Sequence, residues 1–268
     1  MIVLKLGGDI YKEGVSGSLL DDVKDLFLRE RIVIVHGGGD EVTEIAERLG
    51  KRQIFITSPS GIRSRYTDKE TAEIYTMVMA GRINKALTRQ LLSHDLPAVG
   101  LAGIDGQILK AKRKRRLLII DERGRKRIIP GGFTGKITDV NIHLLNLLLE
   151  NGYLPVIAPI ALSEEKEMLN VDSDRAAASI AGALKARSLV FLTDVQGVLV
   201  NGEYVRRIRM HEAEELLRTM GPGMEKKMLA SIEALRFGVK EAVISSGFIE
   251  MPVMNALNHT VGTVITLE

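Results

Sequence analysis

The stretch IVIVHGGGDEVTEIAERL, residues 32–49, decides the fold class. An apolar run, Ile32–Val35, ends in a histidine and three glycines, and Asp40–Leu49 then follows with helical spacing. The chain opens with a similar arrangement, because Ile2–Leu6 ends in Gly7-Gly8. Strand, glycine turn and helix in this order are typical of parallel sheets, which bind ligands at the carboxyl ends of their strands.

The alternation continues to the end of the chain. Further apolar runs predict strands at Ala98–Leu101, Pro155–Ala158, Leu189–Leu192 and Ala242–Ser245. Helical spacing occurs at Asp68–His94, Thr138–Asn151, Asp174–Leu184, His211–Met220 and Gly223–Phe237. Strands that alternate with helices predict a three-layer α-β-α sandwich with a mainly parallel central sheet.

One region departs from this alternation. In Gln107–Ile129, two apolar or basic segments flank Asp121–Gly124, whose composition suits the tip of a β-hairpin on the rim of the sheet. We expect a single domain, 1–268, with two lobes that meet near Gly152–Pro159. The first lobe would comprise about 1–155 and the second about 156–268.

The amino-acid composition is typical of a globular protein and excludes several other classes. The chain of 268 residues is 45% hydrophobic and 26% charged, which is ordinary for a globular protein, and its apolar runs are too short to cross a bilayer. Because a strand-like run starts at Ile2, we expect no secretory signal and a soluble, cytoplasmic protein. The absence of cysteine excludes disulfides, thiolate metal sites and cysteine nucleophiles.

Basic residues are concentrated in one segment. Lys110–Arg127 holds ten Lys or Arg residues against two acidic ones, a local net charge of +8, whereas the whole chain carries +3. The remainder is therefore net acidic. Such a patch indicates one anionic partner surface rather than general nucleic-acid affinity, although a solvated charged hairpin explains the run equally well.

The turn His36–Gly39 is the first candidate for an anion site. Glycines let backbone N–H groups approach an anion closely, and the following helix adds the positive end of its dipole. A tight turn without a ligand is the plainer alternative. The P-loop motif GxxxxGK[ST] is absent from the sequence. The dinucleotide-binding motif GxGxxG is not matched either, because Val42 stands at the position of its third glycine. We expect His36 to be packed or to stabilise the turn, and we predict no protein-bound metal.

Two lysines are candidates for stabilising a transferred phosphoryl group, a reaction that depends mainly on positive charge and alignment. Lys5 lies inside an apolar strand, where an ammonium group is costly unless it reaches a negative ligand. Lys227 lies one turn after the glycine segment Gly221–Gly223. Taken alone, Lys227 is better explained as a surface lysine after an N-capping loop.

Two polar segments precede or follow predicted elements in the second half. In Asn170–Asp174, the last residue could cap the next helix, or the segment could hold substrate and orient a lysine. Asp194 follows the predicted strand Leu189–Leu192, so a nucleotide contact there is consistent with its position but not decided by it.

Together, these segments resemble the amino-acid kinase family, and specifically its acetylglutamate-kinase branch. The family pattern K-x-GG, HGGG, G-[IL]-R, N-x-x-x-D, [ST]-D-V-x-G-[IV]-L and GM-x-x-K is matched in order by Lys5–Gly8, His36–Gly39, Gly61–Arg63, Asn170–Asp174, Thr193–Leu199 and Gly223–Lys227. The resemblance covers essentially the whole chain and implies an ATP-dependent kinase that acts on a carboxyl group. It also implies that the lobe at about 1–155 binds the acceptor substrate and that the lobe at about 156–268 binds the nucleotide.

The resemblance also implies roles for the matched residues. Lys5 and Lys227 would stabilise the moving phosphoryl group, Gly8 and Gly38 would donate backbone N–H bonds to it, and Asp174 would organise the lysines. Arg63 would clamp the substrate α-carboxylate, with Gly38, Gly39 and Asn170 completing the acceptor site. ATP would bring Mg²⁺ with it. The nucleotide would contact Thr193, Asp194, Gly197, Val198, Leu199, Gly221 and Gly223.

Within the branch, the chain is most similar to members whose substrate is held on a small acidic amino-group carrier protein. Gly131–Ile137 reads GGFTGKI, which resembles the GG[YF]TGKI segment of these members. The implied reaction phosphorylates the side-chain carboxylate of carrier-linked aminoadipate or glutamate, in lysine and in some cases arginine biosynthesis. The carrier would bind Arg113, Lys114, Arg115, Arg116 and Lys136.

Three alternatives stay open. Free N-acetyl-L-glutamate is the close competitor as acceptor. A non-catalytic sensor on the same fold has no need of both lysines. An RNA-binding protein would use the basic segment, but Lys110–Arg127 contains no aromatic platform. We expect neither nucleic acid nor membrane as a partner, and the family suggests a homodimer.

Overall fold

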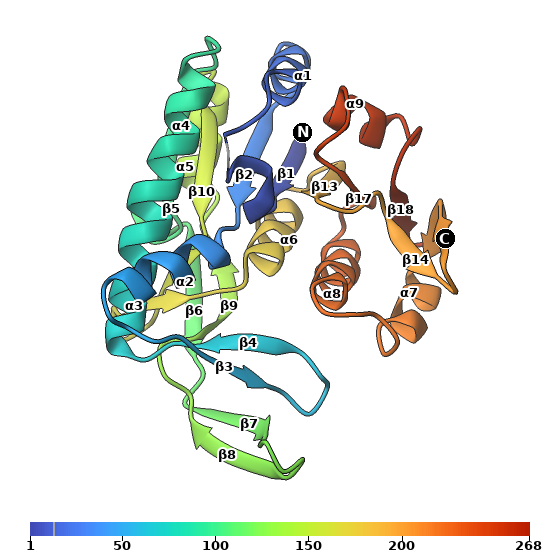
Figure 1. Cartoon of the computed structure of the whole chain (residues 1–268). Helices are drawn as coiled ribbons and strands as arrows, with labels where there is room; N and C mark the ends of the chain where they lie inside the picture. The colour runs from blue at the N-terminus through green and yellow to red at the C-terminus, as the bar shows by residue number, and fades with distance from the viewer. Residues whose placement is uncertain (13) are drawn as a thin grey trace.

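A central sheet of eight strands organises the computed structural model, which describes residues 1–12 and 14–268 (Figure 1). The strands lie in the order β16-β18-β17-β13-β1-β2-β10-β5. Their bounds are β1 Ile2–Leu6, β2 Ile32–His36, β5 Ala98–Ala102, β10 Leu154–Ala158, β13 Ser188–Thr193, β16 Arg207–Arg209, β17 Glu241–Ser246 and β18 Thr263–Thr266.

The sheet is mainly parallel, as expected. Every neighbouring pair from β5 through to β17 is parallel, and only the pair β17–β18 is antiparallel. β1 lies near the middle, with Lys5 opposite Phe191 of β13 on one side and Val35 of β2 on the other. All five residues of β1 are buried, which explains why this strand is a continuous apolar run interrupted by one lysine.

Helices cover both faces of the sheet, which confirms the three-layer sandwich. One hydrophobic cluster joins Val3 and Val33 to α5, α6, α7 and α8; the other joins Ile2 and Ile32 to α1, α4 and α9. Successive strand residues point to opposite faces, so each strand feeds both clusters. The helices on the first face are α5 His143–Glu150, α6 Ser173–Ala183, α7 Met210–Leu216 and α8 Met224–Arg236; on the second, α1 Gly17–Phe27, α4 Asn84–Leu92 and α9 Pro252–Leu257.

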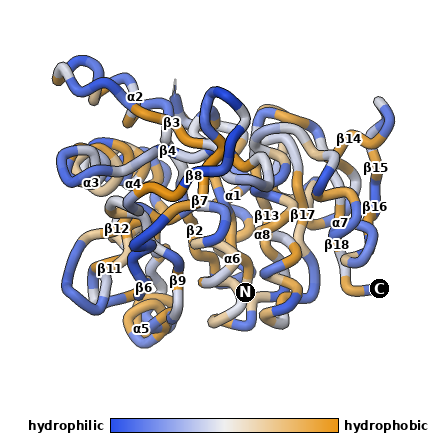
Figure 2. Tube along the Cα trace, turned by 90° about the horizontal axis from the view of Figure 1, so that it is seen from below, coloured by the Kyte–Doolittle hydropathy of each residue, from blue (hydrophilic) through white to orange (hydrophobic). Residues whose placement is uncertain are grey.

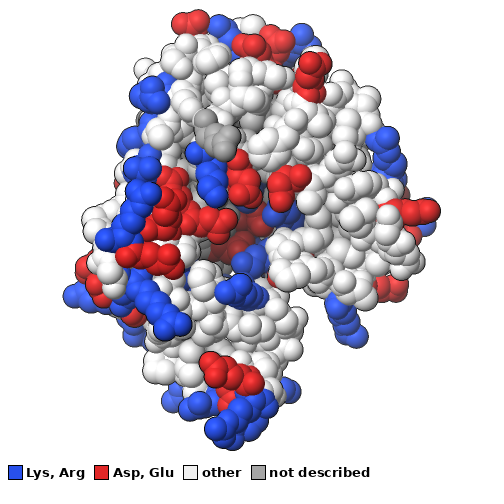
Figure 3. Space-filling view, in the orientation of Figure 1, with Lys and Arg blue, Asp and Glu red and all other residues white. Residues whose placement is uncertain are grey.

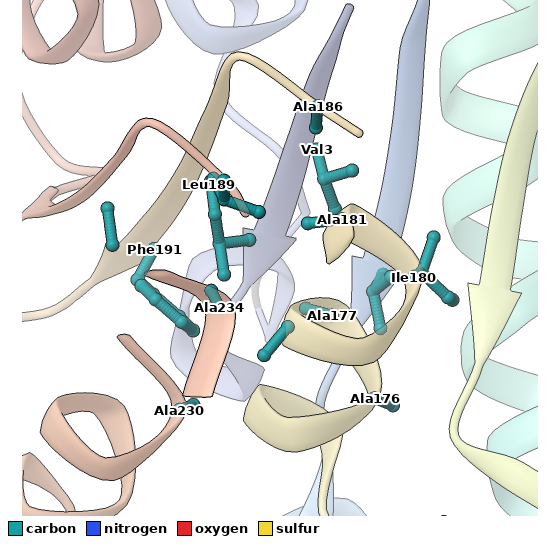
Figure 4. Packing of buried hydrophobic residues seen from close by; sticks show 14 of the residues in the cluster. Val3, Ala176, Ala177, Ile180, Ala181, Ala186, Leu189, Phe191, Ala230 and Ala234 are labelled. Carbon is teal, nitrogen blue, oxygen red and sulfur yellow. The ribbon is translucent and has the colours of Figure 1, made fainter. Parts of the chain in front are cut away.

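Small residues bring α6 and α8 close to the sheet. Figure 4 shows Ala177 and Ala181 of α6 and Ala234 of α8 packed near Leu189 and Phe191. Alanine lets a helix backbone approach its neighbour closely, which fixes the start of each helix relative to the strands. This packing matters for the site because Asp174 and Lys227 lie at the starts of these two helices.

The carboxyl end of the sheet is flanked by α2 Gly39–Arg48 and by a long helical stretch. That stretch consists of α3 Lys69–Thr76, a π-helical segment η2 Met77–Ile83 and α4. It matches the helix expected over Asp68–His94 except for the π segment, which no spacing rule indicated. In the part of the chain that the structure describes, no helix combines the length and apolarity needed to cross a membrane.

In the described part of the chain, three smaller sheets and two 3₁₀ turns complete the fold. Their strand orders are β12-β11-β6-β9, β14-β15 and β4-β3-β7-β8, and the last of these lies at the foot of Figure 1. The bounds are β3 Ile54–Thr57, β4 Arg63–Tyr66, β6 Leu109–Arg113, β7 Arg116–Ile120, β8 Lys126–Pro130, β9 Gly135–Val140, β11 Ile160–Leu162, β12 Met168–Asn170, β14 Val198–Val200, β15 Glu203–Val205, η1 Gly8–Tyr11 and η3 Asp105–Gln107.

Two expectations need correction. The helix predicted over Thr138–Asn151 begins only at His143, because Thr138–Val140 is the end of β9, which pairs with β6. The rim hairpin exists, but it comprises only β7 and β8 around a turn at residues 121–125. The first basic residues, Lys110–Arg113, belong to β6 in a different sheet.

Several helices and strands were not predicted from the sequence. α1, α9 and most of the short strands carry no long apolar run, so nothing marked them. The proposed boundary between lobes falls inside β10, and the central sheet continues without a break across it, since β1 pairs with both β2 and β13. The two lobes therefore do not correspond to a break in the fold. The assignment of one lobe to the acceptor and the other to the nucleotide stays a prediction.

Candidate active site

Two glycine turns meet at the carboxyl ends of β1 and β2. A Cβ atom placed on Gly8 would lie 3.3 Å from the Gly38 Cα and 3.4 Å from its nitrogen, so the two backbones are in direct contact. A side chain on Gly8 would press against Gly38, so this close approach favours glycine. Of the residues that the structure describes, none offers an acceptor to the Gly8 or Gly38 N–H, which leaves both groups available to a ligand.

Lys5 lies at the sheet end beside these turns. Its side chain is 5% exposed, and its Nζ is 2.8 Å from Asp174 Oδ1 in the first turn of α6. Burying a lone ammonium group is costly, so the carboxylate is what lets a lysine occupy this position in β1. The structure thus confirms the proximity of Lys5 and Asp174, which are 169 positions apart in the sequence.

The alternative role for Asp174, capping the helix, belongs to another residue. Asp172 is the N-cap of α6, and its side chain accepts hydrogen bonds of 3.1 Å from the backbone N–H groups of Asp174 and Arg175. Asp174 is therefore free to face Lys5. The sequence did not separate the two aspartates, because both positions at a helix start suit a cap.

Three polar groups converge above Gly37. A Cβ on this glycine would lie 3.5 Å from Lys5 Nζ, 3.5 Å from the Gly8 nitrogen and 3.5 Å from Ser173 Oγ. These three groups therefore lie around Gly37, and an anion bound against this glycine would have an ammonium, an amide and a hydroxyl group nearby. The sequence reading missed Ser173, and its position directly before Asp174 at a helix start was the signal available.

Lys227 brings a second ammonium group to the site from α8. Burial lowers its pKa, whereas the charge of Asp174 raises it. Burial by itself would raise the pKa of Asp174, but Lys5 and Lys227 outweigh that effect and hold it below its usual value. Asp172 differs, because burial and the neighbouring charge of Asp174 raise its pKa. The charge of Asp174 thus interacts with both lysines, and its role in organising them stays a prediction.

A cleft of about 960 Å³ opens over these groups. It runs from the glycine turns to the small sheet β4-β3-β7-β8 and to the start of α8. Of the residues assigned to catalysis, acceptor binding and nucleotide binding, those that line the cleft are Lys5, Gly8, Gly38, Gly39, Arg63, Asn170, Asp174, Gly223 and Lys227.

Two arginines of β4 face this cleft with different degrees of freedom. Arg63 is exposed, and its guanidinium lies 4.5 Å from the centre of the Phe55 ring. Arg65 is buried and donates hydrogen bonds of 2.6 Å to the Gly39 carbonyl and 2.9 Å to Thr43 Oγ1. Arg63 is therefore available to a ligand, whereas Arg65 ties β4 to the glycine turn. The sequence reading did not identify Arg65.

Several residues assigned to the nucleotide lie outside the lining of the cleft: Thr193, Asp194, Gly197, Val198, Leu199 and Gly221. Asp194 is exposed after β13 and accepts a hydrogen bond of 2.9 Å from Thr193 Oγ1. Gly197 is packed against Thr263, which leaves no room for a larger side chain. Their contact with a nucleotide stays a prediction.

The five basic residues assigned to a carrier are held in different ways. Arg113 is engaged within the chain, because it donates to Glu167 at 2.6 Å and to the Gly132 carbonyl and lies 4.0 Å from the centre of the Phe133 ring. Arg115 pairs with Glu165 at the surface. Arg116 is exposed, without an ion pair in residues 1–12 and 14–268. Lys114 and Lys136 line the cleft, and burial lowers the pKa of Lys114.

Two groups of charged side chains on the face shown in Figure 3 bear on the site. Basic side chains crowd the foot of the molecule, where Figure 1 shows β7 and β8, and acidic and basic side chains mix in the hollow above it. Figure 2 shows that the strands of this hairpin are largely hydrophobic between hydrophilic segments. Across the described chain, no three His, Asp or Glu side chains come together as a metal site would require.

Comparison with known proteins gives a family. The model of the amino acid kinase family matches residues 1–246. A protein of Saccharolobus solfataricus named [LysW]-aminoadipate/[LysW]-glutamate kinase is 46% identical over 266 residues, 99% of each chain. A protein of Cenarchaeum symbiosum that carries this name provisionally is 53% identical over 265 residues, again 99% of each.

Solved structures agree on the fold. The protein smu.665 of Streptococcus mutans has a TM-score of 0.79 at 25% identity and covers 100% of this chain and 98% of its own. Giardia carbamate kinase has a TM-score of 0.70 at 15% identity, with coverage of 100% and 98%. These likenesses support the sandwich of three layers described above.

Proposed function

The chain belongs to the amino acid kinase family, and from that premise we propose that it phosphorylates a carboxylate carried on another protein. The donor is ATP, and the acceptor is the side-chain carboxylate of aminoadipate or glutamate linked to an acidic amino-group carrier protein. The relatives named for LysW-linked aminoadipate and glutamate support this acceptor. The pathway is lysine biosynthesis, with arginine biosynthesis as a second use if glutamate is accepted.

The observation that carries the proposal is the convergence of donors above Gly37. Lys5 Nζ, the Gly8 nitrogen and Ser173 Oγ lie around Gly37, and Asp174 holds Lys5 through an ion pair of 2.8 Å. Charge on the transferring phosphoryl group is spread over its oxygens, so fixed positive and N–H groups lower the barrier there. Lys227 supplies the second positive charge, since it lines the same cleft and its charge also lowers the pKa of Asp174.

The proposed phosphoryl transfer needs no general base. A carboxylate oxygen of the acceptor attacks the γ-phosphorus, the bond from that phosphorus to the β–γ bridging oxygen breaks, and ADP leaves with the electron pair. The product is an acyl phosphate. The acceptor carboxyl is already ionised near neutral pH, so no proton has to be removed before attack. The protein's contribution is alignment and charge.

Arg63 and Asn170 are proposed to hold the acceptor. Attachment through the amino group leaves the substrate α-carboxylate free, and a planar guanidinium pairs with a carboxylate through two hydrogen bonds. Arg63 lines the cleft and is exposed. Asn170 lines the same cleft and donates a 3.0 Å hydrogen bond to Thr67 Oγ1, which fixes its amide.

Basic side chains at the mouth of the cleft suit a protein-bound rather than a free acceptor. Lys114 and Lys136 line the cleft, and Arg115 and Arg116 are exposed beside it. Complementary charge raises the rate of association with an acidic carrier. Arg113 contributes differently, since its pairing with Glu167 stabilises the segment that carries these residues.

Further parts of the proposal rest on the family. ATP enters with Mg²⁺ as part of the substrate, and the nucleotide base and ribose are held near Asp194 and the segment Gly197–Leu199. The enzyme acts in the cytoplasm as a homodimer.

Kinetics with two acceptors test the proposal. We expect kcat/KM for carrier-linked aminoadipate or glutamate to exceed that for free N-acetyl-L-glutamate by at least about 100-fold, because the free substrate lacks every contact of the carrier. Equal or better turnover of free acetylglutamate would instead make the chain an acetylglutamate kinase.

A further inference from the structure

The carbonyl of Gly37, in the turn after β2, accepts two hydrogen bonds from the protein interior. One comes from the Tyr11 hydroxyl and the other from His36 Nδ1 at 2.9 Å. His36 is completely buried, and its ring stands edge-on to Tyr11. Neither side chain lines the cleft, so both approach the turn from behind.

Asn84 determines which nitrogen of His36 carries the proton. The Asn84 Nδ2 group is 3.2 Å from His36 Nε2 and also faces the carbonyls of Leu101 at 3.2 Å and Val156 at 2.9 Å. The two carbonyls require the amide nitrogen at this position, and an amide nitrogen cannot accept a hydrogen bond from Nε2. Nδ1 therefore carries the hydrogen, which also fits its contact with the Gly37 carbonyl. Burial lowers the pKa of His36 to about 4, so the ring is neutral at neutral pH and Nδ1 donates to Gly37.

Fixing this carbonyl also fixes the N–H on the same peptide. In a trans peptide the C=O and N–H bonds point in opposite directions, so a Gly37 carbonyl held inward turns the Gly38 N–H outward. Gly38 itself lines the cleft and has a φ of 131°, a backbone conformation that residues other than glycine rarely adopt. A Cβ there would lie 2.3 Å from Ile83 Cδ1 and 2.8 Å from the Tyr11 hydroxyl, so no larger residue fits between the turn and these side chains.

We propose that Tyr11 and His36, the latter oriented by Asn84, are positioning residues that hold the Gly37–Gly38 peptide so that its N–H meets the transferring phosphoryl group. This inference rests on the proposed phosphoryl transfer but not on the identity of the acceptor. Two hydrogen bonds to one carbonyl polarise the peptide, and a polarised peptide has a stronger N–H donor. The gain is greatest where negative charge accumulates during the reaction.

Tyr11→Phe tests the proposal with the least disturbance, because the ring is kept and only the hydroxyl is lost. We expect kcat to fall about 10-fold, with KM for ATP changed less than about twofold, since ground-state binding uses many other contacts. Tyr153→Phe is the matched control, because Tyr153 is exposed and lies outside the cleft. Each variant is measured on whichever acceptor the wild type phosphorylates, so failure of the carrier assignment would leave this test intact.

Two substitutions of His36 separate positioning from packing. His36→Asn places an amide N–H where Nδ1 was and should keep most of kcat, whereas His36→Leu fills the space without a donor and should lose it. Carbonyl ¹³C and amide ¹⁵N resonances from glycine-labelled protein give a second readout. We expect the Gly37 carbonyl and Gly38 amide resonances to move upfield in Tyr11→Phe and His36→Leu and to stay near wild type in His36→Asn.

Unchanged kcat in Tyr11→Phe would overturn the proposal, as would a Gly37 carbonyl resonance that does not move when the hydroxyl is removed. Equal losses in His36→Asn and His36→Leu, accompanied by equal drops in melting temperature, would show that His36 only fills space. If His36→Leu does not fold, Tyr11→Phe and its carbonyl resonance still decide the outcome.

Discussion

The transfer site and the β7–β8 hairpin are both rich in basic side chains, yet they hold them in opposite ways. Lys5 is buried against Asp174, and two glycine backbones touch beside it. In the hairpin, Arg116 and Arg127 are exposed, and β7 is joined to β3 through a single residue pair, Thr57 with Ile120.

The difference matches two tasks. Charges that stabilise a transition state must be in place before the reaction, which requires burial and fixed partners. Charges that attract a partner act through the solvent over about 8–10 Å at ordinary salt and need no fixed geometry. Substitutions in the first region should therefore alter kcat, and substitutions in the second should alter association.

The largest effect is expected from Lys227→Ala. Loss of this ammonium group removes positive charge needed only when the phosphoryl group moves, so kcat should fall about 1000-fold with KM changed only a few-fold. Steady-state kinetics would check this, with Lys240→Ala as the control because Lys240 is exposed in the loop after α8. Wild-type kcat in Lys227→Ala would rule out its catalytic role.

Asp174→Asn should give a smaller loss and a diagnostic change with pH. Removing the carboxylate leaves Lys5 without its partner, and we expect kcat to fall about 100-fold. Asp174 also raises the pKa of Lys227, so without it that pKa falls further. Lys227 would then lose its proton at lower pH, and the alkaline limb of the kcat profile should move to lower pH. A profile that keeps its shape would contradict the electrostatic link between the two residues.

The smallest effect belongs to the hairpin. The double change Arg115→Gln and Arg116→Gln should lower kcat/KM for the carrier-linked substrate about 10-fold at low salt and much less at high salt, with kcat unchanged. Loss of kcat instead would place these residues in the transfer step.

Arg113→Gln offers a contrast within the same basic run. Because Arg113 is paired with Glu167 and lies over Phe133, its loss should lower the melting temperature by about 2–4 °C. Arg115→Gln and Arg116→Gln should leave the melting temperature near wild type, since exposed ion pairs contribute little. Thermal unfolding of the three proteins separates the two roles.

The two regions also differ in how far the sequence predicted them. A lysine inside an apolar strand and several glycines after β1 and β2 are costly for stability unless they have a specific role, so these residues could be singled out from the sequence. The structure brings both glycine turns together with Asp174. The capping role of Asp172 could not be predicted, because Asp172 and Asp174, on either side of Ser173, both stand at a position that suits a helix cap. Ser173 and Arg65 were missed for a related reason, since their contacts join segments distant in the sequence.

The hairpin was read from charge and a turn signal alone. Those features predicted a β-hairpin with its tip near Asp121–Gly124, but charge carries no information about strand partners. The segment Lys110–Arg113 was therefore predicted to belong to the hairpin, whereas it forms β6 in another sheet. The first residues of the helix expected from Thr138 instead form the end of β9, which pairs with β6. Both errors arise from one pairing, β6 with β9.

The most direct test of the account is to trap its product. Wild-type protein, ATP with Mg²⁺ and carrier-linked aminoadipate or glutamate are incubated with hydroxylamine, which converts an acyl phosphate to a hydroxamate, and the intact carrier is then weighed by mass spectrometry. The account predicts ATP-dependent hydroxamate on the carrier with wild type and almost none with Lys227→Ala. An unmodified carrier beside abundant hydroxamate from free N-acetyl-L-glutamate would contradict it.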